Sequence, residues 1–464
     1  MGIWIFLAAA TILRIILSSL FPLSADESYY WLWAKHLDWS YVDHPPMVAL
    51  INYLTTFGKE NLFMLRLGAN ILVLPTSILL YLIGKKYFNE KVAFFSALLF
   101  QLLPHFLIIW LTMFVELPLA LFWTAALFTF LTVIKTKKSY LWYLLAVFIG
   151  LGCLSKYTMF LFWPCLGLFF LLSPENRFWL KRKEPYLAGA LSILFFMPVI
   201  YWNMQHSWIS FTFHSGKVTA YAFGENFLAF IADQLVHFTP FLIFSLYPIF
   251  KHALKRDESS KLLFCFSAPV LALFFVASLK IKVWAHWPAI GYIAALPLAV
   301  LYLTEKKQTL TKFLSWALGF CLLVLAILFW VSPGVLLHQK DYAKNYDLAK
   351  ELPAGQKIFA KTNVTASLLE FYTKRPTYLA TGFLKPGNLW GEKQYEIWGI
   401  PDLGTEENVI FFGNDNKRFR AEAEKRFKLI EAIKGLKFYL IEDYITNNYE
   451  FFELKTYQGK AGHP

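Results

Sequence analysis

The sequence predicts a polytopic α-helical membrane protein with a small soluble α/β domain at its C-terminal end. Two observations on composition lead to this fold class: 57% of the 464 residues are hydrophobic and only 16% are charged. A third is that apolar segments long enough to cross a bilayer recur between residues 3 and 331. A soluble chain of this length could not keep so much apolar surface away from water.

Eleven segments are predicted to span the membrane, and the fifth and sixth are the shortest. The first segment has neither a basic region before it nor a small-residue cleavage site, so we interpret it as a retained helix and not as a signal peptide. The predicted spans are 3–22, 62–84, 92–110, 114–134, 139–154, 157–173, 186–204, 227–250, 262–280, 286–304 and 311–331.

The formal net charge of +13 is distributed unevenly over the loops. If the N-terminus is cytoplasmic, the inner loops hold 17 Lys and Arg residues, whereas the outer loops and outer helix ends hold seven. The positive-inside rule therefore predicts this orientation, and the charge indicates topology, with no nucleic-acid partner expected. We expect a multi-pass membrane protein whose outer loops are extracytoplasmic.

The composition changes abruptly at Ser332-Pro333-Gly334, where charged and mixed sequence replaces the apolar segments. We therefore predict a transmembrane domain at 1–333, with its first outer loop at 23–61, and a soluble extracytoplasmic α/β domain at 334–464. Strand patterns occur at 356–361, 376–381 and 408–413, and a helix pattern at 416–433.

The four cysteines lie in apolar segments without CxxC spacing. This pattern is typical of inert buried thiols, so neither a disulfide framework nor a zinc site is expected. The cysteines are Cys153, Cys165, Cys265 and Cys321.

Asp26 and Glu27 follow the first predicted span directly. Carboxylates beside a membrane are costly unless they are solvated, paired or used, so the pair is either a solvated helix end or part of a site. The aromatic residues between Tyr29 and Trp39 have amphipathic spacing, which predicts a short helix lying in the outer membrane interface. Such a helix would hold the two carboxylates at the depth of the lipid headgroups.

Asp43 and His44 precede two prolines that stiffen the chain as it turns back to the membrane. A carboxylate beside a potential cation suits a phosphate or a hydroxyl nucleophile. A simple hydrogen bond between Asp43 and His44 is the alternative.

Charged residues also mark the outer ends of later spans. Glu116 begins the fourth span, where the helix dipole would favour a carboxylate in any case. Lys156, followed by Tyr157, occupies the tight outer turn between the fifth and sixth spans, and Arg66 lies near the outer end of the second. The positive-inside bias opposes both cations at these places, so each indicates either a nearby anion or a snorkelling side chain.

Two further outer loops combine aromatic rings with hydrogen-bonding groups, a combination suited to stacking on a sugar and binding its hydroxyls. The same rings would also serve as an interfacial aromatic belt. Histidines spread over distant loops have no metal-ligand spacing, so no structural metal is expected. The residues concerned are Trp202, Asn203, His206, Trp208, His214 and Lys217 in one loop and Trp284, His286 and Trp287 in the other.

Five stretches of the sequence together resemble the bacterial glycosyltransferase family 39 group. These membrane transferases have the GT-C fold and are related to protein O-mannosyltransferases and lipid A aminoarabinose transferases. The resemblance covers most of residues 1–300, and the first-loop acids with the His-Pro-Pro turn are its most specific part. The stretches are DESYYWLWAKHLDWSYVDHPPMVALI, ELPLALFW, LSKYT, PVIYWNMQHSWISFTFHSG and VWAHWPAIGYIAA.

The resemblance implies roles for several of these residues. Asp26 matches the proposed catalytic carboxylate, and Glu116 stands where the group usually has Asp. Lys156 matches a lysine near the lipid phosphate. The chain departs from the aminoarabinose transferases at Asp43-His44, where those enzymes have Glu-Lys, so a positive charge there depends on protonation of His44.

The resulting hypothesis is an inverting transfer of one sugar from a polyprenyl phosphate to an acceptor at the outer membrane face, such as lipid A, lipopolysaccharide or another envelope glycan. Lys156, Arg66 and His44 or Lys217 would stabilise the leaving phosphate, and Asp26 would accept the acceptor's proton. No cofactor is obligatory, although a divalent cation could assist. The alternatives are a protein acceptor, a secondary transporter and a non-catalytic outer sensor.

Overall fold

The computed structural model describes residues 2–216, 221–306, 309–331, 345–380, 392–401, 408–414, 424, 427–433 and 449–456. It divides into two compact units that alternate along the sequence. The first unit comprises Met1–Ser18, Asp38–Ile51 and Arg66–Leu328. The second comprises Ser19–Leu37, Asn52–Leu65 and Phe329–Pro464, so part of the predicted first loop (23–61) groups with the C-terminal residues.

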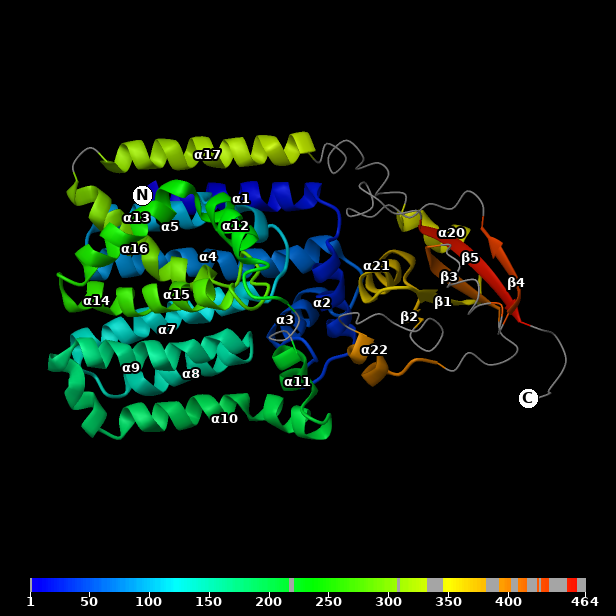
Figure 1. Ribbon diagram of the computed structural model, residues 1–464, viewed down its shortest axis with the longest axis horizontal. Coiled ribbons are helices and arrows are strands. Elements are labelled where there is room, and N and C mark those ends of the chain that lie inside the picture. Colours follow the sequence, from blue (N-terminus) through cyan, green and yellow to red (C-terminus); the bar gives the residue numbers. More distant parts are fainter. Residues whose placement is uncertain are drawn as a thin grey trace. The chain divides into compact units, whose positions relative to one another are not determined.

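All the regular secondary structure in the described part of the first unit is helical, and most of the long helices run side by side (Figure 1). α1, α3, α4 and α17 begin or end in the second unit. The helices are α1 (Gly2–Leu20), α3 (Met47–Thr56), α4 (Leu62–Tyr87), α5 (Glu90–Leu102), α6 (Pro104–Ile109), α7 (Glu116–Thr136), α8 (Leu141–Cys153), η1 (Tyr157–Leu161), α9 (Phe162–Leu172), η2 (Pro174–Lys181), α10 (Glu184–Gln205), α11 (Ile209–Gly216), α12 (Phe227–Phe238), α13 (Pro240–Ala253), α14 (Glu258–Cys265), α15 (Ala268–Ala277), α16 (Ala289–Glu305) and α17 (Thr309–Val331).

Two of the predicted spans are broken at prolines. α5 ends before Leu103, whose extended ψ of 136° is the conformation that a following proline imposes, and α6 begins at Pro104. α12 and α13 meet at an angle of 92° around Thr239, which has a φ of 65° and caps α13 through its hydroxyl. These breaks allow polar side chains to enter an otherwise apolar bundle.

Among the described residues, five helices are long and apolar enough to cross a membrane, or six if α12 and α13 count as one span. Shorter apolar helices occupy the remaining predicted segments, including α8 and α16. The helical, multi-span character predicted from the sequence is therefore confirmed. The number of eleven spans stays a prediction.

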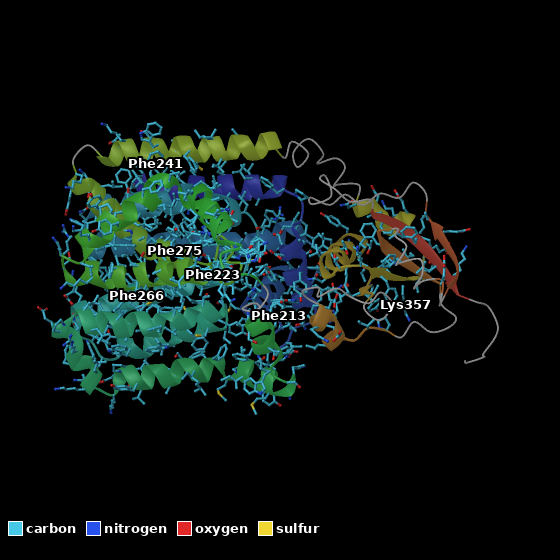
Figure 2. The ribbon with its side chains drawn as sticks, viewed as in Figure 1. Phe213, Phe223, Phe241, Phe266, Phe275 and Lys357 are labelled. Carbon is cyan, nitrogen blue, oxygen red and sulfur yellow. The ribbon has the colours of Figure 1, made fainter. Side chains whose placement is uncertain are left out.

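The interior of the first unit is rich in aromatic rings, and side chains fill the space between its helices (Figure 2). Phe266 is fully buried, with its ring centroid 4.4 Å from that of Phe162, 5.9 Å from that of Trp123 and 5.9 Å from that of Phe130. These tilted and edge-on contacts join α7, α9 and the end of α14.

The second unit combines short helices with a mixed sheet. The first-loop helix α2 (Ala25–Lys35) belongs to it, together with η3 (Asn345–Asp347), α20 (Leu348–Glu351), α21 (Asn363–Thr373) and α22 (Glu392–Trp398). The strands are β1 (Lys357–Ala360), β2 (Thr377–Leu379), β3 (Val409–Asn414), β4 (Phe427–Ala432) and β5 (Tyr449–Thr456).

The five strands are arranged in the order β2-β1-β3-β5-β4. β1 runs parallel to β2 and β3, whereas β5 is antiparallel to β3 and β4. Phe359, Phe411 and Phe452 lie in the hydrophobic core beside the sheet. The strand patterns at 356–361, 376–381 and 408–413 are confirmed by β1, β2 and β3.

The helix predicted at 416–433 is wrong at its C-terminal end. Residues Phe427–Ala432 form β4, which pairs with β5 from Phe427 opposite Thr456 to Ala432 opposite Phe452. The charged residues gave this segment a helical period, but backbone pairing with a distant strand decided its conformation. The rest of the segment lies outside the described residues, apart from Glu424.

Candidate functional site

A buried ion pair lies at the centre of the candidate site in the first unit. Nζ of Lys156 pairs with Oε1 of Glu116, and the two side chains are 7% and 4% exposed. Glu116 opens α7, and Lys156 stands in the turn between α8 and η1. Burying two charges is costly unless they compensate each other, which this contact achieves.

His286 and Trp287 complete the surroundings of the ion pair. Nε2 of His286 lies 3.3 Å from the same Oε1 atom of Glu116. The ring centroid of Trp287 is 5.7 Å from Nζ of Lys156, within the range of a cation–π interaction. The structure thus brings together Glu116, Lys156 and His286, three predicted site residues that are far apart in sequence.

The second carboxylate oxygen of Glu116, Oε2, is buried and has no hydrogen-bond partner among the described residues. Buried polar atoms are rarely left unpaired, and the exceptions often mark functional sites. A carboxylate oxygen is an acceptor only, so it suits a hydroxyl or amide group of a bound molecule.

The His-Pro-Pro turn of the first loop is fixed against other elements of the same unit. Nε2 of His214 on α11 lies 2.9 Å from the backbone oxygen of Asp43. The rings of His44 and His214 are 6.3 Å apart, and the ring of Tyr157 lies edge-on to His214 at 5.3 Å. Asp43, His44, Tyr157 and His214 therefore meet beside the turn that carries Lys156.

Further contacts from α3 and α10 fix the turn that carries Lys156 and the first loop. The backbone N–H of Met47 donates to the carbonyl of Leu154, 3.0 Å away, just before Lys156. Nε1 of Trp202 donates to Asp38 at 2.7 Å, and the ring of His206 stacks on Trp202 at 4.1 Å. His206 is thus placed by Trp202, whose other contact reaches the first loop.

Arg66 makes a contact at another place in the first unit. Arg66 is 2% exposed, and its guanidinium donates to the backbone oxygen of Ser18 near the end of α1. This contact holds α1 against α4. Lys217 lies outside the described residues.

Asp26 and Glu27 lie in the second unit, in the first turn of α2. Ser24 caps this helix: its hydroxyl accepts from the backbone N–H of Glu27, and the Glu27 carboxylate accepts in return from the backbone N–H of Ser24. Glu27 is fully buried, whereas Asp26 is exposed. The two adjacent acids therefore differ, because one carboxylate caps a helix and the other faces outward.

The aromatic residues of α2 are buried in protein. Trp31 is fully buried with its ring edge-on to Phe371 of α21 at 4.9 Å, and Tyr29 lies 6.4 Å from Trp398 of α22. The interpretation of these rings as a lipid-facing platform is wrong for Tyr29 and Trp31. Amphipathic spacing does not distinguish a face buried against lipid from one buried against protein.

Two polar groups inside the bundle were missed by the sequence analysis. Nδ1 of His105 on α6 lies 3.3 Å from Nδ1 of His237 at the α12–α13 break, and His105 is fully buried. Arg14 of α1 donates to Gln101, which donates in turn to Ser77 at 2.6 Å. Ionisable residues inside apolar segments were the available signal.

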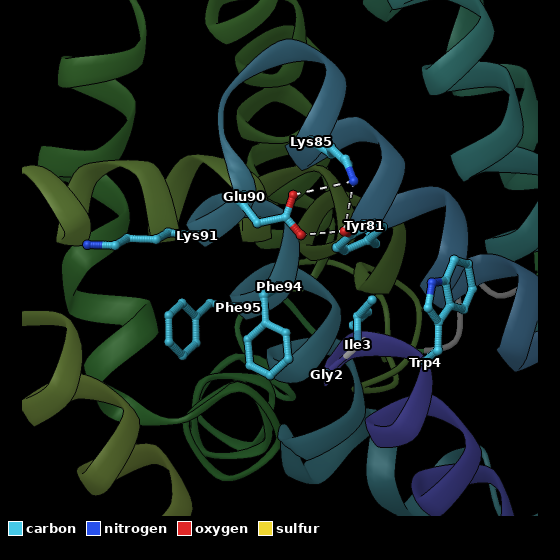
Figure 3. A pocket seen from close by; sticks show the side chains of 9 residues that line it. All are labelled: Gly2, Ile3, Trp4, Tyr81, Lys85, Glu90, Lys91, Phe94 and Phe95. Carbon is cyan, nitrogen blue, oxygen red and sulfur yellow. Dashed lines mark hydrogen bonds and ion pairs between the residues drawn. The ribbon is translucent and has the colours of Figure 1, made fainter.

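A cavity of about 430 Å³ lies elsewhere in the first unit, between α1, α4 and α5 (Figure 3). Three of its polar residues contact one another: Tyr81 donates to Glu90, and Lys85 lies 3.6 Å from Glu90. None of the predicted site residues lines it. Across the described residues, no group of three or more His, Cys, Asp or Glu side chains could hold a metal ion.

Comparison with known proteins relates this chain to membrane glycosyltransferases. A family model described as dolichyl-phosphate-mannose-protein mannosyltransferase matches residues 43–202, which include Glu116 and Lys156. The lipid A galacturonosyltransferase RgtD of Rhizobium johnstonii is 25% identical over 292 residues. That alignment spans 61% of this chain and 61% of the relative's length.

Solved structures show the same fold. The crystal structure of ArnT from Cupriavidus metallidurans bound to undecaprenyl phosphate matches with a TM-score of 0.71 at 12% identity, over 97% of this chain and 98% of that one. The apo oligosaccharyltransferase of Archaeoglobus fulgidus matches with a TM-score of 0.52 at 14% identity, over 90% of this chain and 71% of that one. The helical architecture is therefore the GT-C fold.

Proposed function

We infer that this chain is a GT-C membrane glycosyltransferase of the family 39 group, and we propose that it moves one sugar from a polyprenyl phosphate to a lipid acceptor. The observation that carries the proposal is the buried Glu116–Lys156 pair, which lies inside the matched family segment and leaves one carboxylate oxygen unpaired. A matched transferase segment also favours an enzyme over a transporter or a sensor.

The proposed reaction is a single displacement with inversion. The acceptor oxygen forms a bond to the anomeric carbon as the bond between that carbon and the phosphate oxygen breaks. The phosphate leaves with the bonding electrons, and the proton of an acceptor hydroxyl passes to Asp26 acting as general base. If the acceptor is an anionic phosphate, no proton is transferred and Asp26 only orients it.

Lys156 would stabilise the charge that develops on the departing phosphate. In the absence of substrate its ammonium group is neutralised by Glu116, so a donor phosphate must share the cation or take it over. The carboxylate oxygens of Glu116 would then accept a hydrogen bond from a hydroxyl group of the sugar or of the acceptor. We assign Arg66, His44, Asp43, Tyr157, His206, His214 and His286 to the lining of the same substrate site, with Lys217 and Glu27 as further predicted members.

The proposed acceptor is lipid A or another envelope glycan. Support comes from RgtD, which is named as a lipid A galacturonosyltransferase, and from ArnT, whose structure holds undecaprenyl phosphate. A protein acceptor is the second candidate, because the matched family model is described as a protein mannosyltransferase.

The proposed location is the bacterial inner membrane, with eleven spans, the active site in the periplasm, and residues 334–464 as an extracytoplasmic α/β domain. The predicted outer loops contain fewer Lys and Arg residues than the predicted inner loops, which supports this orientation. We propose no obligatory cofactor, with a divalent cation as an optional aid to phosphate departure.

Mass spectrometry of a deletion strain tests the proposal. Lipid A, envelope glycans and periplasmic proteins should be compared between the parent, the deletion and the complemented strain. Loss of one sugar from lipid A or another glycan, restored by the wild-type chain and not by Asp26→Asn, is expected. Loss from proteins alone would select the second candidate, and unchanged glycosylation of all three fractions would contradict a transferase.

A further inference from the structure

The first-loop helix α2 packs along α21 within the second unit. The hydroxyl oxygens of Ser28 and Ser367 are 2.8 Å apart, and both residues are fully buried. One turn further, the ring of Trp31 contacts that of Phe371. These two contacts join residues that are more than 330 positions apart in sequence.

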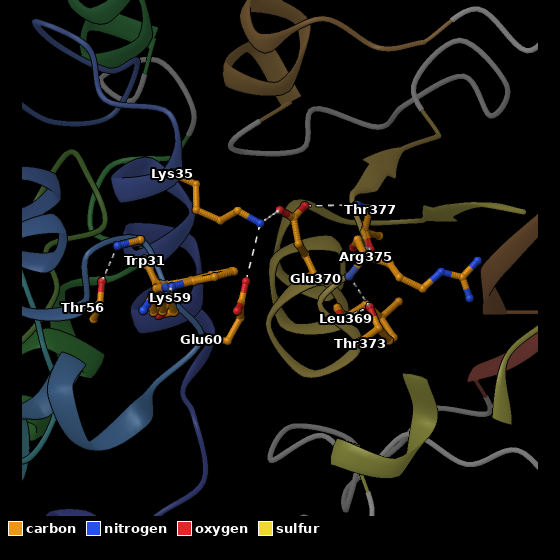
Figure 4. A network of polar contacts seen from close by, with 11 residues as sticks. Trp31, Lys35, Thr56, Lys59, Glu60, Leu369, Glu370, Thr373, Arg375 and Thr377 are labelled. Atoms are coloured by element: carbon orange, nitrogen blue, oxygen red, sulfur yellow. Dashed lines mark hydrogen bonds and ion pairs between the residues drawn. The ribbon is translucent and has the colours of Figure 1, made fainter. Parts of the chain in front are cut away.

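A charged contact holds the other end of α2. Nζ of Lys35 lies 2.7 Å from Oε1 of Glu370 and 3.7 Å from Glu60 (Figure 4). The Glu370 side chain is only 7% exposed, and its Oε2 accepts from the backbone N–H of Thr377 at 3.0 Å. Glu370 is therefore fixed from two sides, since one oxygen binds the start of β2 and the other binds α2.

The geometry of a helix places these contacts on one face of α2. Trp31 follows Ser28 by three residues and Lys35 follows it by seven. The three side chains therefore point in nearly the same direction. Asp26 precedes Ser28 by two residues, which turns its side chain roughly 200° away from that face. The contact with α21 thus fixes the helix while leaving the Asp26 carboxylate exposed, as observed.

We propose that Glu370, with Lys35 and Ser367, positions Asp26 for catalysis. None of these three residues needs to touch substrate; they act by fixing the rotation and height of an 11-residue helix that carries the base in its first turn. This inference rests on the proposed function. Displacing a catalytic group by about 1 Å can lower a rate by 10²-fold, so an ion pair remote from the reaction can control it.

Kinetics of conservative variants test the proposal. Glu370→Gln keeps an acceptor for Thr377 and removes only the charge that holds Lys35, and Lys35→Met removes the other partner. Each should lower kcat about tenfold or more while the KM for the polyprenyl-linked donor stays within about twofold. The double variant should be no worse than either single one, because both changes remove the same contact.

Lys393→Met is the matched control. Lys393 forms an ion pair of the same 2.7 Å length with Glu396 in the same unit, but both side chains are exposed, at 62% and 42%. This variant should behave like the wild type. If Glu370→Gln and Lys35→Met also keep wild-type kcat, the positioning role is overturned.

An engineered disulfide separates positioning from folding. With Ser28→Cys and Ser367→Cys, oxidation should join α2 to α21 and restore most of the kcat lost in Glu370→Gln, and reduction should remove that gain. The four native cysteines are buried, which keeps the background low. Failure of the two cysteines to cross-link, or a cross-linked Glu370→Gln protein with no recovery of kcat, would contradict the proposal.

The Asp26→Asn variant distinguishes failure of this inference from failure of the proposed function. An inactive Asp26→Asn protein together with fully active Lys35 and Glu370 variants would remove the positioning role alone. A fully active Asp26→Asn protein would remove the base that these residues are proposed to position.

Discussion

Lys156 and Glu116 form an ion pair although 40 positions separate them in sequence, and both side chains are almost completely buried. Each charge is tolerated because the other is present. Replacing one partner therefore does more than delete a contact with substrate, since it strands the remaining charge in a low-dielectric environment.

Lys156→Ala should destabilise the protein by about 3–5 kcal/mol, the usual cost of leaving a buried charge unpaired. The double variant Lys156→Met with Glu116→Gln removes both charges and should recover most of that stability, yet transfer should remain low. Thermal unfolding in detergent and sugar transfer should be measured on the same samples. Wild-type transfer by the double variant would show that the ion pair has only a structural role and would contradict its proposed part in the reaction.

Glu27→Gln should leave sugar transfer within about tenfold of the wild type, because Gln can also complete the capping box with Ser24. Glu27→Ala cannot, and losing a helix cap costs roughly 0.5–2 kcal/mol. Circular dichroism, unfolding and transfer assays compare the two variants. Transfer abolished in a stable Glu27→Gln protein would make Glu27 a catalytic carboxylate after all.

Reporter fusions should confirm the orientation deduced from the loop charges. A reporter after Lys86 is expected in the cytoplasm and one after Gly216 in the periplasm, because 17 Lys and Arg residues lie on one side and seven on the other. Paired alkaline phosphatase and fluorescent-protein fusions at each position provide internal controls. A cytoplasmic Gly216 would place the His214 loop on the wrong side for a periplasmic site.

Local chemistry allowed much of the candidate site to be predicted from the sequence. Glu116 and Lys156 stood out because charge at the outer end of an apolar segment is costly, and His286 because it lies among aromatic rings in a predicted outer loop. The structure brings all three into contact. The pairing itself could not be predicted, because it depends on how α7, α8 and the loop before α16 pack. Lys156 therefore looked like a free phosphate ligand, although Glu116 already neutralises it.

The features missed or misjudged have the same origin. Residues Phe427–Ala432 have a helical pattern of charges, but pairing with β5 makes them a strand. The rings of α2 had the spacing of a membrane-surface helix, but α21 covers them. In each case the deciding partner is distant in sequence, and local periodicity carries no information about it.

The most direct test is sugar transfer by the purified chain in proteoliposomes that contain a polyprenyl-phosphate sugar and lipid A. The measured quantity is the sugar that appears on the acceptor together with the polyprenyl phosphate released, for the wild type and for Asp26→Asn. We expect equal amounts of both products from the wild type and a rate lower by about 10²–10⁴-fold from a properly inserted Asp26→Asn protein. Wild-type rates in that variant, or no transfer by the wild type to lipid, glycan or protein acceptors, would contradict the account.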